Sequence, residues 1–273
     1  MNGSVALTPE QETLLIPLVA KARQDAWSDP ILPDETAAQV LRGLGRTVPT
    51  LPVLRGDAFG LALRARQLDQ WTTAFLMRQP AATVLHLGCG LDGRIDRVRP
   101  SPQVRWFDLD LPEVIALRRA VYPRTEGPGY QMIGAPVTNG QWLAQVPTDL
   151  PTLIVAEGLL MYLPEADVRQ LVIRLSETFS SGELLLDALS PLGTRLGAWH
   201  PALRASGARL RWSLRDPRQL MAWAPHMTLL EHVGLLDLPG FARLRSLERL
   251  AWRTVRRIPT LREFHQLLRY RLS

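Results

Sequence analysis

The sequence has one cysteine and no apolar segment long enough to span a membrane. Cys89 stands alone among 273 residues, so an intrachain disulfide is excluded and neither a zinc cluster nor another metal site is expected. The apolar run over residues 14–20 is short and contains Pro17. No basic segment followed by an apolar one opens the chain, so we expect neither a signal peptide nor a membrane span. The expected location is therefore the cytoplasm.

Lysine is almost absent as well. Lys21 is the only one, so 31 of the 32 basic residues are arginine, and the formal net charge is +6. Residues 241–273 hold nine arginines and two glutamates, a net charge of +7, which leaves the first 240 residues at about −1. The basic character therefore belongs to the C-terminal tail. A solvated helix face that pairs with acidic residues is the favoured interpretation, ahead of a membrane-surface or acidic-partner role.

Apolar periodicity predicts an α/β fold. Helical patterns fill the first eighty residues, and short continuous apolar runs then alternate with helical segments. Such an alternation is typical of a mainly parallel sheet covered by helices on both faces. Strands are expected at 83–87, 104–107, 130–137, 152–156, 183–187 and 227–233, and helices from Thr8-Pro9 and at 34–44, 57–77, 113–122, 165–179 and 216–223.

The same patterns suggest three regions within one structural domain. We expect an N-terminal helical cap over residues 1–80 and a cofactor-binding core over 81–240 that includes a substrate-covering insertion. A basic helical C-terminal tail is expected over 241–273.

A glycine-rich loop follows the first expected strand. Residues 88–93 read Gly-Cys-Gly-Leu-Asp-Gly, which matches G-x-G-x-x-G and allows a ligand to approach the backbone closely. Asp108 and Asp110 lie 20 and 22 residues after Gly88, where a dinucleotide site or an S-adenosylmethionine site would place an acid against ribose hydroxyls. The loop alone does not distinguish the two cofactors.

Two further acids favour S-adenosylmethionine. Asp92 lies inside the loop, where a carboxylate would repel a pyrophosphate but would tolerate a cationic sulfonium and ammonium. Glu157 follows the fourth expected strand, at the edge of the sheet where ligands of open α/β folds bind. A dinucleotide enzyme has no particular use for this second acid.

Three ordered segments carry a family resemblance. Residues 87–92, 108–114 and 156–163 resemble the signatures of the leucine carboxyl methyltransferase family, in particular its bacterial O-methyltransferases of polyketide synthesis of the tetracenomycin-pathway type. The resemblance implies a class I Rossmann-like methyltransferase with a seven-stranded, mainly parallel sheet, an N-terminal helical cap and a C-terminal lid. It also implies that S-adenosylmethionine is the cofactor.

The resemblance assigns a set of residues to the methionine part of the cofactor. Arg64 lies where the family's arginine grips the methionine carboxylate, with Arg66 as the alternative, and Lys21 is expected to help from the first helix. Gly88 and Gly90 would bring the backbone close to the same part.

Other residues are assigned to the rest of the cofactor. Asp110 would accept the ribose hydroxyls, and Glu157 would lie near the methionine portion and the sulfonium. Pro136 and Val137 fall where related proteins place an Asp-Leu pair against the adenine. Because proline has no side-chain acceptor, the adenine contact is expected to pass to Asn139 or to the backbone.

The resemblance implies methyl transfer to an oxygen, a carboxylate or a hydroxyl, of a small molecule of polyketide type. A carboxylate acceptor is already ionised at neutral pH, which fits the lack of an evident catalytic base. A phenol would need deprotonation, and His200 would then become the candidate base. Tyr162 is a further candidate in the substrate wall.

Three other functions are compatible with parts of the sequence. The arginine-rich tail suggests a nucleic-acid methyltransferase, but Glu157 and the three residues after it replace the Asn/Asp-Pro-Pro-aromatic tetrad of enzymes that methylate exocyclic base nitrogens. Methylation of a protein C-terminal carboxylate is a second alternative, and a catalytically inactive, cofactor-binding partner subunit is a third. The prediction remains a small-molecule acceptor and no nucleic-acid partner.

Overall fold

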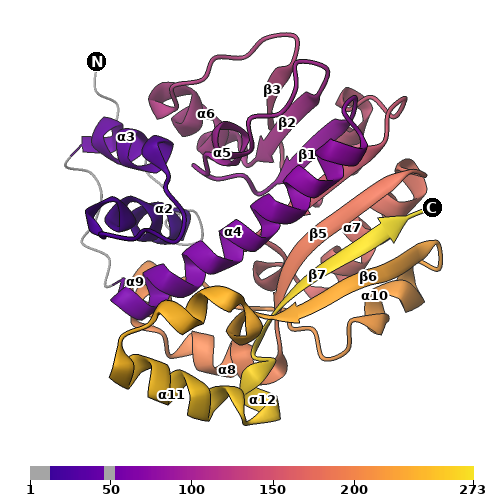
Figure 1. The fold of residues 1–273 in the computed structure, drawn as a ribbon. Coiled ribbons are helices and arrows are strands. Elements are labelled where there is room, and N and C mark those ends of the chain that lie inside the picture. Colours follow the sequence, from indigo (N-terminus) through magenta and orange to yellow (C-terminus); the bar gives the residue numbers. More distant parts are fainter. Residues whose placement is uncertain (1–12, 46–52) are drawn as a thin grey trace.

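A seven-stranded sheet forms the centre of the protein (Figure 1). The computed structural model describes residues 13–45 and 53–273, so the helix start expected at Thr8-Pro9 lies outside the described residues. The strand order is β3-β2-β1-β4-β5-β7-β6, with β1 to β5 parallel and β7 antiparallel to both of its neighbours. The strands are β1 Thr83–Leu87, β2 Arg105–Asp110, β3 Tyr130–Gly134, β4 Thr152–Ala156, β5 Gly182–Leu189, β6 Met227–Gly234 and β7 His265–Leu272.

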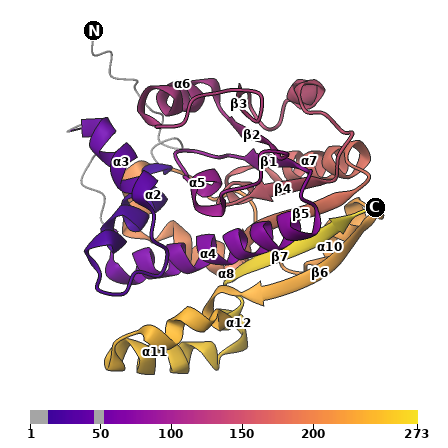
Figure 2. The same cartoon turned by 45° about the horizontal axis from the view of Figure 1, so that its top comes forward.

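Alternate side chains of the strands enter two separate apolar cores. In β1, Val84 belongs to the core that also contains residues of α4 (Arg55–Arg78), while Leu85 and Leu87 belong to the core that contains residues of α7 (Glu165–Thr178). All five residues of β1 are buried, as expected for a strand covered on both faces. Helix α4 and helix α7 consequently lie on opposite sides of the sheet (Figure 2).

Two short helices pack beside α4 at one end of the molecule (Figure 1). Helix α2 (Leu15–Ala22) contacts both α3 (Glu35–Leu44) and α4. The side chain of Asp34 accepts a hydrogen bond from the backbone N–H of Ala37 at 2.9 Å, which caps α3 where the sequence predicted its start. These elements border the carboxyl ends of the parallel strands.

The remaining helices lie on the two faces of the sheet and at the lower end of the molecule as drawn in Figure 1. After β1 and β2 come α5 (Arg94–Val98) and α6 (Pro112–Val121), and α10 (Arg218–Trp223) packs against α7. The segment after β5 forms α8 (Pro191–Ala198) and α9 (Pro201–Ser206), and the chain later adds α11 (Ser246–Arg256) and α12 (Pro259–Arg262). The predicted class I Rossmann-like fold is confirmed.

The expectation of a helical tail over residues 241–273 was wrong for its last part. Residues 265–272 form β7, which inserts between β5 and β6. Arg269 and Arg271 dominate the charge of this segment, but they alternate with buried Leu268, Tyr270 and Leu272. This alternation has the period of a strand, and the concentration of arginine obscured it.

Several arginines of the C-terminal tail pair with acidic residues elsewhere in the chain. Arg256 and Arg262 donate to Asp237 at 2.8 and 2.7 Å. Arg269 donates to Glu183 at 2.7 Å. These pairs agree with the interpretation that the basic tail meets acidic residues of its own chain.

Candidate active site

One cavity of about 700 Å³ opens at the carboxyl ends of the parallel strands. This is the edge at which open α/β sheets bind their ligands. Nine residues singled out from the sequence as cofactor or catalytic candidates line it, whereas the alternatives Arg66 and Asn139 do not, and the individual roles remain predictions. The nine residues are Lys21, Arg64, Gly88, Gly90, Asp110, Val137, Glu157, Tyr162 and His200.

The glycine loop presents its backbone to the cavity. Gly88 and Gly90 have φ angles of 60° and 49°, in the left-handed region that favours glycine. A Cβ atom at Gly88 would lie 3.0 Å from the side chain of Leu159, so a larger residue would also fill the space beside the loop. The loop is therefore shaped for close approach of a ligand.

A buried ion pair supports this loop from behind. Arg118 and Asp108 are both fully buried, and the guanidinium donates to the carboxylate at 2.6 Å. Arg118 also donates to the carbonyl oxygens of Gly90 at 3.1 Å and of Asp92 at 2.9 Å. The ion pair thus fixes the conformation of the loop.

Asp110 lies at the end of β2 and accepts two backbone hydrogen bonds. Its oxygens receive the N–H groups of Gly90 at 2.8 Å and Leu111 at 2.7 Å, and it forms no ion pair with any described residue. Burial raises the pKa of Asp110 above its usual value. Asp110 lines the cavity, and each of its oxygens accepts one of these bonds and retains further acceptor capacity, which suits the two donor hydroxyls of a ribose.

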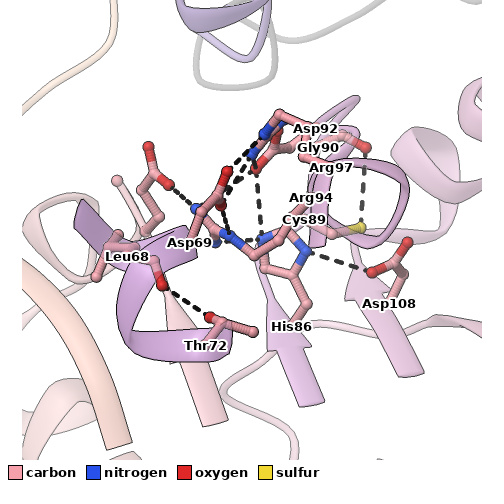
Figure 3. A network of polar contacts seen from close by, with 12 residues as sticks. Leu68, Asp69, Thr72, His86, Cys89, Gly90, Asp92, Arg94, Arg97 and Asp108 are labelled. Carbon is pink, nitrogen blue, oxygen red and sulfur yellow. Dashed lines mark hydrogen bonds and ion pairs between the residues drawn. The ribbon is translucent and has the colours of Figure 1, made fainter. Parts of the chain in front are cut away.

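Asp92 is neutralised by cations, in contrast to the sequence argument. Lys21 donates to it at 2.6 Å, and Arg97 donates to Asp34 at 2.6 Å. Figure 3 shows Arg97 between Asp92 and Asp69, to each of which it donates at 2.7 Å. Although burial disfavours the charged form, Arg97 and Lys21 hold the pKa of Asp92 well below its usual range. Asp92 is consequently a structural counter-ion, and it does not by itself distinguish a cationic cofactor.

Glu157 is paired in the same way. Arg64 donates through Nε at 2.9 Å, and Arg94 donates through Nη2 to the other oxygen. Burial opposes ionisation, but Arg64 and Arg94 lower the pKa of Glu157. Arg64 also donates through Nη1 to Asp187 at 3.0 Å, while its Nη2 hydrogen-bonds none of the described residues. That Nη2 group is available for the carboxylate of a ligand, and Arg66 does not line the cavity.

Acidic side chains outnumber cationic ones around the cavity. The described residues that line it include five carboxylates and two permanent cations, a sum of −3 with histidine neutral. Such an excess fits a ligand with net positive charge, such as S-adenosylmethionine. The carboxylates are Asp34, Asp57, Asp92, Asp110 and Glu157, and the cations are Lys21 and Arg64.

The region expected to hold the adenine is lined by Pro136, Val137 and Thr138. The side chain of Asn139 does not line the cavity. Its Oδ1 accepts the N–H of Gln141 at 3.1 Å and caps a short 3-10 helix. Of the two sequence alternatives for the adenine contact, the backbone of this segment is therefore the better placed.

The two sequence candidates for catalysis are both engaged by other groups. His200 Nε2 lies 3.0 Å from Asp57, and Nδ1 accepts the N–H of Ala202 at 3.3 Å, so neither ring nitrogen is free. Burial raises the pKa of Tyr162, whose side chain hydrogen-bonds Thr13, and its phenol stays protonated at neutral pH.

Sequence reasoning did not single out the other two histidines of the cavity, His86 and His265. His265 lines it, and its Nε2 lies 2.6 Å from Oδ2 of the fully buried Asp187. Asp187 follows three leucines of the strand, which is a signal for a site acid. His265 had no such signal, because the strand that it opens was taken for part of a helical tail.

The described residues give no indication of a metal site or a membrane span. They contain no cluster of three or more histidine, cysteine or acidic side chains that would hold a metal ion. Within the same ranges, no helix has the length and apolar character that crossing a bilayer requires.

Comparisons with known proteins agree with this geometry. The leucine carboxyl methyltransferase family matches residues 15–176. The tetracenomycin polyketide synthesis O-methyltransferase TcmP of Streptomyces glaucescens is 40% identical over 270 residues, which cover 99% of each chain. The S-adenosyl-L-methionine-dependent methyltransferase dpfgK of Gibberella zeae is 34% identical over 262 residues, which cover 89% of this chain and 87% of that protein. A solved DUF574 family protein of Streptomyces avermitilis shares the fold, with a TM-score of 0.57 at 15% identity over 96% of this chain and 97% of that one.

Proposed function

We propose that this chain, which belongs to the leucine carboxyl methyltransferase family and is an S-adenosylmethionine-dependent methyltransferase, methylates a carboxylate oxygen of a small apolar metabolite. The observation that carries the proposal is that one cavity joins an acidic end at the glycine loop to an apolar end. The first would hold the cofactor and the second the acceptor. The apolar end is lined by Leu196, Leu203, Leu235, Leu236 and Phe241.

One relative supports an acceptor of polyketide type, and the cavity walls support a ring-shaped one. The protein of Streptomyces glaucescens, named for tetracenomycin polyketide synthesis, aligns over nearly the whole chain, including the segments that form the apolar end. A wall of leucines and one phenylalanine suits the face of a ring system better than it suits a charged or phosphorylated polymer.

The chemistry requires positioning more than proton transfer. S-adenosylmethionine supplies a methyl group on a sulfonium. Arg64 would hold the methionine carboxylate through Nη2, and Asp110 would hold the ribose. A carboxylate acceptor is ionised at neutral pH, so the protein has only to place its oxygen in line with the methyl carbon. Such orientation lowers a barrier by up to about 7–11 kcal/mol in favourable cases.

Calorimetric titration with S-adenosylhomocysteine tests the cofactor half. We expect the wild type to bind and Asp110→Ala to bind about 10- to 100-fold more weakly, because hydrogen bonds to a charged group contribute about 1.5–3 kcal/mol. Asp149→Ala is the matched control, since among the described residues this aspartate forms an ion pair with Arg105 alone, at the surface. Equal affinities for the two variants would contradict the assignment of Asp110.

Transfer of a labelled methyl group tests the acceptor half. The protein is incubated with labelled S-adenosylmethionine and a panel of naphthoic and anthracene carboxylic acids, and the products are identified by mass spectrometry. Methyl esters are expected. Cofactor binding without any ester, or transfer of the label to nucleic acid or protein in place of the ring acids, would overturn the proposal.

A further inference from the structure

The pair formed by His265 and Asp187 gives the cavity a proton acceptor. We infer that His265 acts as a general base and that the enzyme therefore also methylates hydroxyl groups of ring-shaped acceptors. This second activity rests on the proposed function, because it uses the same cofactor and the same apolar end of the cavity. The two activities differ in one requirement, since a hydroxyl must lose its proton and a carboxylate has none to lose.

His265 reaches the cavity from the strand that closes the sheet. It is the first residue of β7, its backbone is in register with Leu189 at the end of β5, and it lines the cavity. The residue as a whole is 8% exposed. The rings of Phe264 and His265 are arranged edge to face, with centroids 6.1 Å apart, which restricts the orientation of the imidazole.

Asp187 determines which ring nitrogen carries the proton. It is fully buried, and although burial opposes ionisation, Arg64 and His265 lower its pKa. An ionised carboxylate can only accept hydrogen bonds, so the neutral imidazole must carry its proton on Nε2, 2.6 Å from Oδ2 of Asp187. The lone pair then lies on Nδ1, which no described residue hydrogen-bonds.

The carboxylate itself is held by two further groups. The backbone N–H of Gly158 donates to Oδ1 at 2.5 Å, and Arg64 donates to Oδ2 at 3.0 Å. Because Arg64 also contacts Glu157, His265 is linked through Asp187 and Arg64 to the end of the cavity that is expected to receive the methionine part. Two other histidines line the cavity, and the nitrogens of both contact other side chains or the backbone. His200 contacts Asp57 and the N–H of Ala202, and His86 lies 3.3 Å from both Asp108 and Arg94.

The proposed step balances in atoms and charge. Nδ1 of His265 takes the hydroxyl proton, and the acceptor oxygen forms a bond to the methyl carbon as the sulfur–carbon bond breaks and its electron pair returns to sulfur. The products are the methyl ether, S-adenosylhomocysteine and an imidazolium. Asp187 stabilises the imidazolium, which then releases its proton to water.

A single probe that carries both acceptor groups separates the two activities. With 3-hydroxy-2-naphthoic acid, the wild type is expected to form the methyl ester and the methyl ether. In His265→Gln the amide can still donate to Asp187 but has no basic nitrogen, so ether formation should fall about 100-fold or more while ester formation changes little. His232→Gln is the matched control, because His232 is exposed on β6 and does not line the cavity.

An acidic phenol provides the second measurement. A nitro-substituted naphthol that is already ionised at neutral pH needs no base, so the defect of His265→Gln should shrink toward the wild-type rate. A structural role for His265 would depress both phenols and the ester equally, and that result would overturn the inference. Absence of the ether in the wild type would also overturn it, whereas absence of the ester alone would count only against the proposed function.

Discussion

Replacing Asp108 by asparagine should be one of the most destabilising single changes in the protein. Asp108 and Arg118 are both fully buried, 2.6 Å apart. Asp108→Asn removes the only formal negative charge that contacts this guanidinium among the described residues. Removing one partner of a buried ion pair costs about 3–5 kcal/mol, because the other charge is left uncompensated.

The remaining contacts of Asp108 place the effect in the upper half of this range. Its oxygens also accept the indole N–H of Trp106 at 2.8 Å and the hydroxyl of Tyr130 at 2.7 Å. An asparagine keeps one acceptor oxygen and turns an N–H₂ group toward one of these donors. With a shift of about 2–4 °C per kcal/mol in a domain of this size, the melting temperature should fall by about 8–20 °C.

Scanning calorimetry measures the melting temperatures of the wild type and of Asp108→Asn. Asp149→Asn is the control, since its pair with Arg105 lies in solvent and its loss should hardly change the melting temperature. Because Arg118 also holds the carbonyl oxygens of Gly90 and Asp92, we expect Asp108→Asn to weaken cofactor binding as well. A melting temperature equal to that of the control would refute the reasoning.

Two further predictions concern acid stability and the glycine loop. Five carboxylates around the cavity and behind the loop have folded-state pKa values below their usual ones, namely Asp69, Asp92, Asp108, Glu157 and Asp187. The stability that they contribute is complete above their unfolded-state pKa values of about 4 and is lost as the pH falls through their folded-state pKa values. The melting temperature should therefore fall steeply below about pH 4. Asp110 slightly opposes this fall, because its folded-state pKa is raised. An unchanged melting temperature between pH 6 and pH 3 would contradict the prediction. Gly88→Ala places a side chain at a φ of 60° and 3.0 Å from Leu159. Denaturant titration should show a loss of about 1–2 kcal/mol in the free energy of unfolding, and calorimetric titration should show weaker cofactor binding. Gly127→Ala, whose Cβ would meet no atom within 4 Å, should show neither effect.

The fold was largely predictable because its signals are local. Continuous apolar runs that end at Gly88, Asp110 and Glu157 placed three strand ends, and parallel strands bring such ends to one edge. The nine candidate residues accordingly line one cavity. Strand β7 was missed because the many arginines of the tail suggested a solvated helix face. They concealed that Arg269 and Arg271 alternate with buried residues at the period of a strand.

The ion pairs were not predictable, because they depend on distance in space. Arg94 and Glu157 are 63 residues apart, and Arg64 and Asp187 are 123 residues apart. A sequence shows that Asp92 is acidic, but only the packing of α2 and α5 against the loop shows that Lys21 and Arg97 neutralise it. The dyad of His265 and Asp187 requires the same information, since it joins two strands that are neighbours only in the sheet.

Arg97 contacts three carboxylates, those of Asp34, Asp69 and Asp92, which come from the cap of α3, from α4 and from the glycine loop. For the history of the protein, this arrangement means that we expect few single substitutions at these positions to be neutral, because each leaves a buried ion with one partner fewer. We therefore expect relatives to change the cluster by exchanging several members together. The apolar residues that line the other end of the cavity, such as Leu196 and Phe241, hold no charge that needs a partner, so we expect divergence between relatives to concentrate there.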